Sequence, residues 1–320
     1  MSLYLPTISA ATAAHIKQAH IISHNNRWSV LKASGSNIRQ YLQGQITQDI
    51  EKLNSQQAIH SCILSPQGKA VSEIYIIAGH NDELIILTPS SHAVATVERL
   101  RQFSLGQQLR IGVVDSLAVA TAHGVSAINM LTDFGIQADS SHSDWLACSN
   151  NEAEDTFAMN MQSELQSYWV IGAKTHLDQI IHKQQQANDG ELEALRILHG
   201  QPVFGVEWDE RLHPLNANLI EFDGVDFKKG CYVGQEVTSR MHWRGGIKKK
   251  LYRVQLDAQP LELPCPIRSS ANIGELKSAA IDAQGSCFGI ALLPIETAES
   301  HVNLTLEQDN NVTILEVCHA

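Results

Sequence analysis

The chain has 320 residues, of which 43% are hydrophobic and 18% are charged, a composition typical of soluble globular proteins. Its 23 basic and 34 acidic residues give a net charge of −11, which argues against broad, non-specific nucleic-acid binding. No run of about 18 apolar residues predicts a membrane span, and the N-terminal residues lack the basic and apolar segments of a secretory signal. We therefore expect a cytoplasmic protein of two or three domains.

A pattern of strand, turn and helix occurs twice along the chain. Residues 28–33 predict a strand, and residues 38–43 predict a helix after a turn that contains glycine. Residues 117–122 again predict a strand, and residues 125–135 predict a short helix after a second glycine turn. The order of elements is the same in both segments, which indicates an internal repeat.

A second pair of segments supports this repeat. Residues 83–88 predict a strand that is followed by a helix over 90–103. Residues 168–172 predict another strand, with a helix over 175–186. Together the two pairs predict an α+β fold with two related subdomains, each a small sheet with helices on one face.

The pattern changes after Gly246, where no long helical period is found. Short strand candidates alternate there with Pro, Gly, Asn and Asp, as in a small antiparallel barrel or sandwich. We therefore expect two related α+β subdomains over residues 1–115 and 116–246 and a C-terminal antiparallel β-barrel over 247–320. Its strand candidates are 251–256, 272–281, 287–293, 301–307 and 311–317.

The six cysteines are scattered and form no CxxC pair, which indicates a reducing compartment without a disulfide framework. Cys231 lies in the segment FDGVDFKKGCYVGQE, residues 222–236. Lys228, Lys229 and a helix predicted to begin near Gly234 would each stabilise a thiolate at this position. The alternative is a buried cysteine that packs in a tight loop. A metal site is not expected, because the loop offers only one ligand.

Three motifs resemble the folate-binding YgfZ/IBA57 family, which is related to the aminomethyltransferase of the glycine cleavage system. The most specific is KGCYVGQE at 229–236, and the others are YLQGQITQD at 41–49 and SPQGK at 65–69. The resemblance implies two related α/β subdomains and a C-terminal β-barrel around a folate site. This architecture agrees with the repeat and with the barrel predicted above.

The resemblance also implies a role for particular residues. Trp28 matches a tryptophan that lines the family's folate site, where an aromatic plane suits a stacked pterin. Without the resemblance, the sequence would predict an aromatic residue of the hydrophobic core at this position. Leu192 stands where the family has a second tryptophan. Leu198 replaces a glutamate that binds the pterin in aminomethyltransferases, and Arg196 and Glu207 are candidates to compensate.

In the KGCY loop the resemblance implies a redox-active thiol, or a transient ligand to a cluster or partner, at Cys231. The remaining positions of the motif loop are Lys229, Gly230, Tyr232, Gly234, Gln235 and Glu236.

The resemblance implies tetrahydrofolate or another folate as cofactor, and iron–sulfur client or assembly proteins as partners. It implies support for the assembly or repair of iron–sulfur enzymes, tRNA-modifying ones included, with no membrane or direct nucleic-acid partner. One alternative is a folate-dependent aminomethyltransferase or other one-carbon transferase, although its acidic pair is reduced here to Ser72 and Glu73. The other is a binding module without chemistry. No His–acid pair stands out, so a conventional catalytic cycle is not expected.

Overall fold

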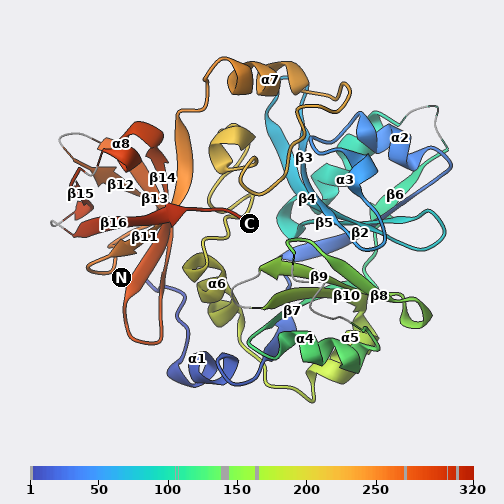
Figure 1. Ribbon diagram of the computed structural model, residues 1–320, viewed down its shortest axis with the longest axis horizontal. Coiled ribbons are helices and arrows are strands. Elements are labelled where there is room, and N and C mark those ends of the chain that lie inside the picture. Colours follow the sequence, from blue (N-terminus) through green and yellow to red (C-terminus); the bar gives the residue numbers. More distant parts are fainter. Residues whose placement is uncertain are drawn as a thin grey trace. The chain divides into compact units, whose positions relative to one another are not determined.

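The computed structural model describes residues 3–104, 106, 108–137, 144–162, 166–269, 272–300, 302–307 and 310–320. The chain forms two compact units (Figure 1). The sheet unit contains 14–187, 223–235 and Ala320, and the barrel unit contains 1–13, 188–222 and 236–319. Within the described ranges, no helix has the length and apolar character needed to cross a membrane.

The sheet unit contains two five-stranded sheets in which all neighbouring strands are antiparallel. The first sheet has the order β3-β4-β5-β2-β6, and the second has the order β1-β7-β10-β9-β8. The strands of the first sheet are β2 (Trp28–Ser34), β3 (Ile59–Leu64), β4 (Ala70–Ala78), β5 (Leu84–Pro89) and β6 (Arg110–Val113). Those of the second are β1 (Ile21–His24), β7 (Leu117–His123), β8 (Cys148–Asn151), β9 (Thr156–Gln162) and β10 (Ser167–Ala173).

The two sheets have the same strand order. Strands β7, β10, β9 and β8 of the second sheet take the places of β2, β5, β4 and β3 of the first. The edge strands are exchanged between them. Strand β1 precedes β2 in the chain but pairs with β7, whereas β6 precedes β7 but pairs with β2. The shared strand order confirms the predicted repeat.

Helices cover one face of each sheet (Figure 1). Helices α2 (Ile38–Gln43) and α3 (Ala93–Gln102) pack apolar side chains on the first sheet. Helices α4 (Ala127–Met130) and α5 (Lys174–Ile181) do the same on the second. The predicted helix over 38–43 agrees with α2, because Ile38, Tyr41 and Leu42 are its buried residues. The helix predicted over 125–135 is shorter, since a 3₁₀ turn replaces its second half.

A glycine is required at the same point of each repeat. Gly35 follows β2 with φ of +133°, and Gly124 follows β7 with φ of +127°. A Cβ atom would lie 2.4 Å from the Gln108 carbonyl oxygen at Gly35 and 2.3 Å from the Ala19 carbonyl oxygen at Gly124. Both contacts involve the backbone just before the exchanged edge strand. Only glycine combines this φ with so close an approach.

The barrel unit contains a closed barrel with the order β11-β14-β13-β12-β15-β16, which confirms the predicted C-terminal barrel. Helix α8 (Ile295–Glu299) and strand β12 (Cys265–Arg268) were not among the predicted elements, and residue 301 of one strand candidate lies outside the described residues. The other strands are β11 (Lys249–Leu256), β13 (Asn272–Ile281), β14 (Cys287–Pro294), β15 (Leu304–Thr305) and β16 (Asn311–Val317). The remaining α-helices are α1 (Ala10–Ile16), α6 (Asp189–Leu198) and α7 (Gln235–Trp243).

Candidate functional site

Cys231 differs from the other cysteines in its accessibility. All six cysteines lie in the described ranges, and Cys231 alone is exposed. Burial raises the pKa of Cys148 to about 12 and the pKa of Cys287 to about 11. A buried thiol of raised pKa is a poor nucleophile, because the thiolate is the reactive form. The exposed position is the one expected for a functional thiol.

Lys229 anchors the loop that carries Cys231. Its amine is buried and donates hydrogen bonds of 2.8 Å to the carbonyl oxygens of Ile46 and Gln48. Burial lowers the pKa of Lys229 to about 8, although the nearby Asp49 and Asp226 act in the opposite direction. The amine therefore holds the KGCY loop on the YLQGQITQD segment. Its role as a charge beside the sulfur stays a prediction.

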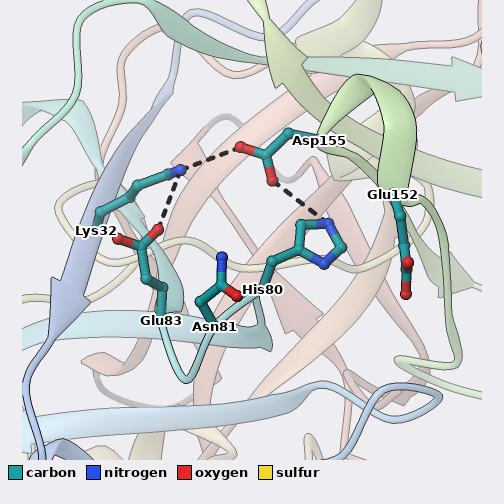
Figure 2. Close-up of a pocket in the computed structure, with 6 residues that line it drawn as sticks. All are labelled: Lys32, His80, Asn81, Glu83, Glu152 and Asp155. Atoms are coloured by element: carbon teal, nitrogen blue, oxygen red, sulfur yellow. Dashed lines mark hydrogen bonds and ion pairs between the residues drawn. The ribbon is translucent and has the colours of Figure 1, made fainter.

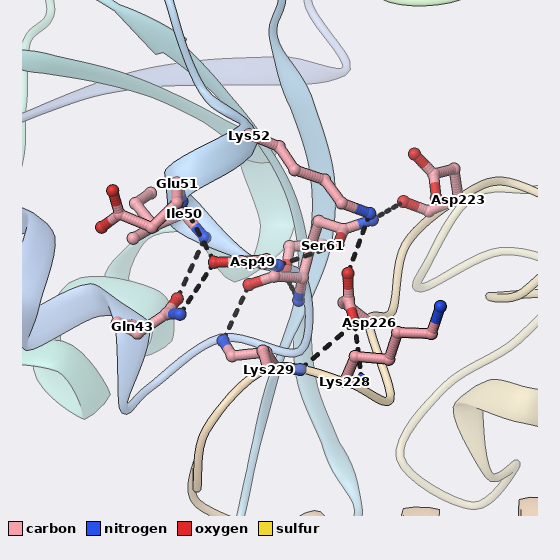
Figure 3. A network of polar contacts seen from close by, with 11 residues as sticks. Gln43, Asp49, Ile50, Glu51, Lys52, Ser61, Asp223, Asp226, Lys228 and Lys229 are labelled. Atoms are coloured by element: carbon pink, nitrogen blue, oxygen red, sulfur yellow. Dashed lines mark hydrogen bonds and ion pairs between the residues drawn. The ribbon is translucent and has the colours of Figure 1, made fainter.

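Asp226 forms a second anchor, between the segment 222–236 that carries Cys231 and residues 47–52 (Figure 3). Its carboxylate accepts a hydrogen bond of 2.6 Å from the backbone N–H of Lys228 and lies 3.0 Å from the amine of Lys52. Burial alone would raise the pKa of Asp226, but these two groups lower it. Its backbone N–H donates to the carbonyl of Thr47, whose hydroxyl donates to the Gly224 carbonyl at 2.6 Å.

Gly234 brings the third motif to this loop. Its φ is +84°, and a Cβ atom there would lie 2.7 Å from the carbonyl oxygen of Ser65 and 2.8 Å from Cβ of Leu64. Ser65 begins the tight turn of the SPQGK motif, which closes with a hydrogen bond to Lys69. The structure thus brings all three motifs together in the sheet unit, although they are far apart in the sequence.

The remaining motif positions have plainer surroundings. Gly230 is exposed, and no atom lies within 4 Å of a Cβ built on it. The Tyr232 ring is buried with the Lys229 amine 5.1 Å from its centre. Gln235 begins α7, as predicted, and its backbone N–H donates to Tyr232, while exposed Glu236 pairs with Arg240.

Cys231 lines a groove of about 890 Å³ in the sheet unit. The other walls come from α2, from the turn before it, and from the turn between β4 and β5. Arg39, Gln43 and Asn81 contribute polar side chains to these walls. The groove is therefore wide enough for part of a ligand or of a partner chain to approach the thiol.

Trp28 belongs to an aromatic cluster between the two sheets of the sheet unit. Its ring centre lies 4.7 Å from that of Trp169 and 5.4 Å from that of Tyr75. Side chains alternate between the two faces of a strand, and these three point away from the helices that cover each sheet. All three are buried, Trp28 with 6% of its surface exposed.

A buried His–acid pair lies beside this cluster. His60 Nε2 is 2.9 Å from Glu73 Oε1, and the ring of Tyr75 stacks on His60 at 4.7 Å. Burial and the hydrogen-bonded Glu73 carboxylate raise the pKa of Tyr75 well above its usual value. The pair is not apparent in the sequence, because it depends on the register of β3 and β4. Glu73, noted only as part of a reduced acidic pair, is thus one member of a network.

The other two predicted folate residues lie in the barrel unit, on α6. Leu192 is half-buried near the start of the helix. Arg196 is buried, and its five N–H donors are taken by Glu193, Glu207 and the carbonyl of Gln201. Burial alone would lower the pKa of Arg196, but the two carboxylates raise it. A folate contact would therefore cost Arg196 one of these bonds, and Glu207, the other candidate, is already paired.

A second polar cavity, of about 610 Å³, lies where a hairpin of each sheet meets β2 (Figure 2). Lys32 Nζ is 3.1 Å from Asp155 Oδ2 and 3.3 Å from Glu83 Oε2. Burial alone would lower the pKa of Lys32, but these carboxylates raise it. No group of three or more metal-ligating side chains is found in the described part of the chain. The charged side chains that line this cavity form an ion-pair cluster, which links the two sheets.

The chain has relatives among known proteins, although no protein-family model matches it. The tRNA-modifying protein YgfZ of Blochmanniella pennsylvanica is 24% identical over 233 residues, which cover 71% of this chain and 69% of that protein. YgfZ of Aliivibrio fischeri strain MJ11 is 24% identical over 93% of this chain and 92% of its own length. A mitochondrial iron-sulfur cluster assembly factor IBA57 homolog of Coccidioides immitis is 26% identical over 77% of this chain and 58% of its own.

A solved structure gives an independent comparison of the fold. The glycine cleavage system aminomethyltransferase T of Bartonella henselae superposes with a TM-score of 0.82. The superposition covers 97% of this chain and 88% of that enzyme, with 12% sequence identity. The chain therefore has the aminomethyltransferase fold, and at this identity the likeness concerns the fold alone.

Proposed function

The chain belongs to the YgfZ/IBA57 family, and from this premise we propose that it binds a reduced folate and supports the assembly or repair of iron–sulfur enzymes. The relatives' names describe a tRNA-modifying protein and an iron–sulfur cluster assembly factor. One role joins the two descriptions if the enzymes that this protein supports include tRNA-modifying iron–sulfur enzymes.

The observation that carries the proposal is the position of Cys231. An exposed thiol lies on a loop that two anchors, buried Lys229 and half-buried Asp226, hold against residues 46–52. Such anchoring is more than an inert surface loop requires, and it keeps the sulfur at the edge of a groove. We assign Cys231 the role of a redox-active thiol or of a transient ligand to a cluster or partner, and the two anchors the role of positioning it.

The aromatic cluster supports the folate part of the proposal. Trp28, Tyr75 and Trp169 form a group of rings that suits a flat heteroaromatic ligand such as a pterin. A reduced folate carries one-carbon groups when bound. In this chain Trp28 would hold the pterin by stacking. Leu192 and Arg196 belong to the other unit, and the donors of Arg196 are already taken.

An aminomethyltransferase is the second candidate, because the chain has that enzyme's fold. Its chemistry requires a carboxylate that faces the developing charge. Ser72 stands at the first acidic position and hydrogen-bonds to Thr88 at 2.6 Å. Glu73 is buried and is hydrogen-bonded to His60 and Tyr75. This arrangement favours the assembly role over transferase activity.

Thiol alkylation tests the role of Cys231. With iodoacetamide at pH 7.5 and peptide mass spectrometry, we expect Cys231 to react at least about 100-fold faster than Cys62 or Cys148, which are exposed only on local unfolding. Cys231→Ser is expected to keep the wild-type free energy of unfolding and to abolish rescue of iron–sulfur enzyme activity in cells that lack this protein. Rescue by Cys231→Ser, with Cys148→Ser as the control, would refute the assignment.

Calorimetric titration tests the folate site. We expect tetrahydrofolate or its 5-formyl form to bind the wild-type chain, and Trp28→Leu to weaken binding about 5- to 150-fold through loss of one stack. Trp243→Leu serves as the control, because Trp243 is exposed on another unit. A parallel glycine-cleavage assay separates binding from turnover, and turnover would favour the transferase.

A further inference from the structure

One short segment of this acidic chain is strongly basic. Residues 240–250, RMHWRGGIKKK, contain five of the 23 basic residues, while the whole chain carries a net charge of −11. The segment includes the end of α7 and the start of β11, all within the barrel unit. The proposed folate and thiol functions make no use of it.

An exposed tryptophan lies in the middle of this segment. Trp243 has 72% of its surface exposed, and it is the only large apolar side chain that is exposed among residues 236–250. The ring of His242 lies 4.6 Å from it in an edge-to-face arrangement. With this exposure the indole presents much of its flat surface to solvent.

Three cations of the segment are left for a ligand. Arg240 pairs with Glu236, and Lys250 pairs with Glu221. Across the described residues, Arg244, Lys248 and Lys249 take part in no ion pair, and all three are exposed. Two basic residues of the segment are therefore held in ion pairs, and the three others lie within six residues of Trp243 in the sequence.

The backbone of the segment is fixed in advance of binding. Gly245 has φ of +68°, and the N–H of Gly246 donates to the carbonyl of Met241 at 2.8 Å, as in a Schellman motif. A Cβ at Gly246 would lie 3.0 Å from Cα of Met241, so the turn packs closely on α7. The Lys248 carbonyl accepts from Ile295, which anchors the strand that follows. A preformed turn thus joins Trp243 and Arg244 to Lys248 and Lys249.

We propose that this surface, defined as Trp243, Arg244, Lys248 and Lys249, binds a short single-stranded nucleic acid. A base would stack on the indole of Trp243, and the three cations would contact neighbouring phosphates. Single-stranded nucleic acids are held in this way, by aromatic platforms between basic side chains. The −11 charge excludes an extensive contact, since a duplex would bring many phosphates against an acidic surface.

An acidic protein partner fits the surface less well. The core of a protein interface is apolar, with aromatic anchors surrounded by other desolvated side chains. Among residues 236–250, every exposed residue except Trp243 and Gly245 is charged, and no second large apolar side chain is exposed. The surface offers a stacking plane and point charges without such a core.

Fluorescence anisotropy of the full chain with 5′-fluorescein-labelled twelve-nucleotide oligouridylate tests the proposal without folate. We expect saturable binding. The logarithm of the association constant should fall linearly with the logarithm of the salt concentration, with a slope of about −2, which is about −0.7 for each contacted phosphate. Trp243→Ala should weaken binding about 5- to 150-fold, and Trp243→Phe should restore most of it. Arg244→Gln, Lys248→Gln and Lys249→Gln combined should bring the slope close to zero.

Matched controls remove the same groups elsewhere. Lys17→Gln, Arg110→Gln and Lys183→Gln combined remove three other exposed cations, and Tyr4→Ala removes another exposed aromatic side chain. Both should bind like the wild type, and oligothymidylate in a parallel titration distinguishes RNA from DNA. The proposal fails if oligouridylate does not bind, if the distant triple variant weakens binding equally, or if Trp243→Ala has no effect. It also fails if polyglutamate or duplex RNA binds more tightly to the same surface.

Discussion

The two sheets of the sheet unit share a strand order but differ in the chemistry they carry. Where geometry is demanding, they agree: Gly35 and Gly124 occupy the same turn with nearly the same φ. Where side chains act on a ligand or a partner loop, they diverge. In the first sheet the turn after β3 is Ser65–Lys69 and packs under Gly234 of the KGCY loop. In the second sheet the turn after β8 is acidic and joins the ion-pair cluster of Lys32.

This difference shows which features of a repeat are kept for folding and which are free to change. The backbone that leads into each exchanged edge strand, β6 or β1, passes close to Gly35 or Gly124, so both turns favour glycine strongly. The residue just before each glycine has no such constraint. It is half-buried Ser34 in the first sheet and buried His123 in the second. The first sheet became the support of Cys231, and the second did not.

Alanine at the two turn glycines tests the equivalence of the repeats and should have the largest effect. Gly35→Ala and Gly124→Ala each combine an unfavourable φ with a clash against a backbone oxygen. Each is expected to lower the free energy of unfolding by about 2–5 kcal/mol, measured by urea denaturation. Gly106→Ala is the control, because its φ is +82° but no atom lies within 4 Å of the new Cβ. It should cost only about 1 kcal/mol. If only one of the two substitutions lowered the free energy of unfolding, the two turns would not be equivalent.

His123 should make the second sheet sensitive to acid. Burial lowers the pKa of His123 to about 4, whereas the unfolded chain keeps a value of about 6.5. Between these values the unfolded chain binds a proton that the folded chain does not, so stability falls as the pH drops from 6.5 to 4. The loss should reach about 3 kcal/mol below pH 4.

A pH series of unfolding free energies checks this prediction. His123→Gln removes the titration, so the variant should gain on the wild type as the pH falls through this window. His182→Gln, at an exposed position of the second half, should follow the wild type. A parallel fall for His123→Gln and the wild type would mean that the acid sensitivity lies elsewhere.

Lys229 tests whether the first sheet holds the Cys231 loop through buried hydrogen bonds. Lys229→Met keeps the length of the side chain but leaves the carbonyls of Ile46 and Gln48 without their donor. The free energy of unfolding should fall by about 1–3 kcal/mol, and amide exchange over residues 226–235 should accelerate. Lys228→Met is the matched control, because Lys228 is exposed. Equal effects of the two variants would show that the loop is not anchored in this way.

Local patterns predict much of this fold. The spacing of Ile38, Tyr41 and Leu42 predicts α2, and the two glycine turns predict the repeat. The alternation of short apolar runs after Gly246 predicts the barrel. The exchange of β1 and β6 is not predictable in this way, because the sequence of a four-residue strand does not indicate which distant strand it pairs with.

The candidate site is predictable in its residues but not in their partners. The motif identifies Lys229, yet its contacts are backbone carbonyls, which have no sequence signature. Arg196 is a plausible ligand in the sequence, and only the fold reveals that Glu193 and Glu207 occupy its donors. The His60–Glu73 pair depends on a strand register that one residue of slip would destroy.

The ion-pair cluster of Figure 2 gives the smallest expected effect, and it tests whether charge also holds the two sheets together. Lys32 and Asp155 come from different sheets, and their side chains are 29% and 42% exposed. Exposed pairs of this kind contribute about 0–1 kcal/mol. Asp155 has φ of +46°, so Asp155→Asn is the suitable change, since asparagine tolerates this conformation. A double-mutant cycle with Lys32→Met should give a coupling below about 1 kcal/mol at low salt, and close to zero in about 1 M NaCl. A larger coupling energy that persists in salt would mean that the second sheet also contributes a specific polar contact. The two sheets would then differ less in their chemistry than proposed above.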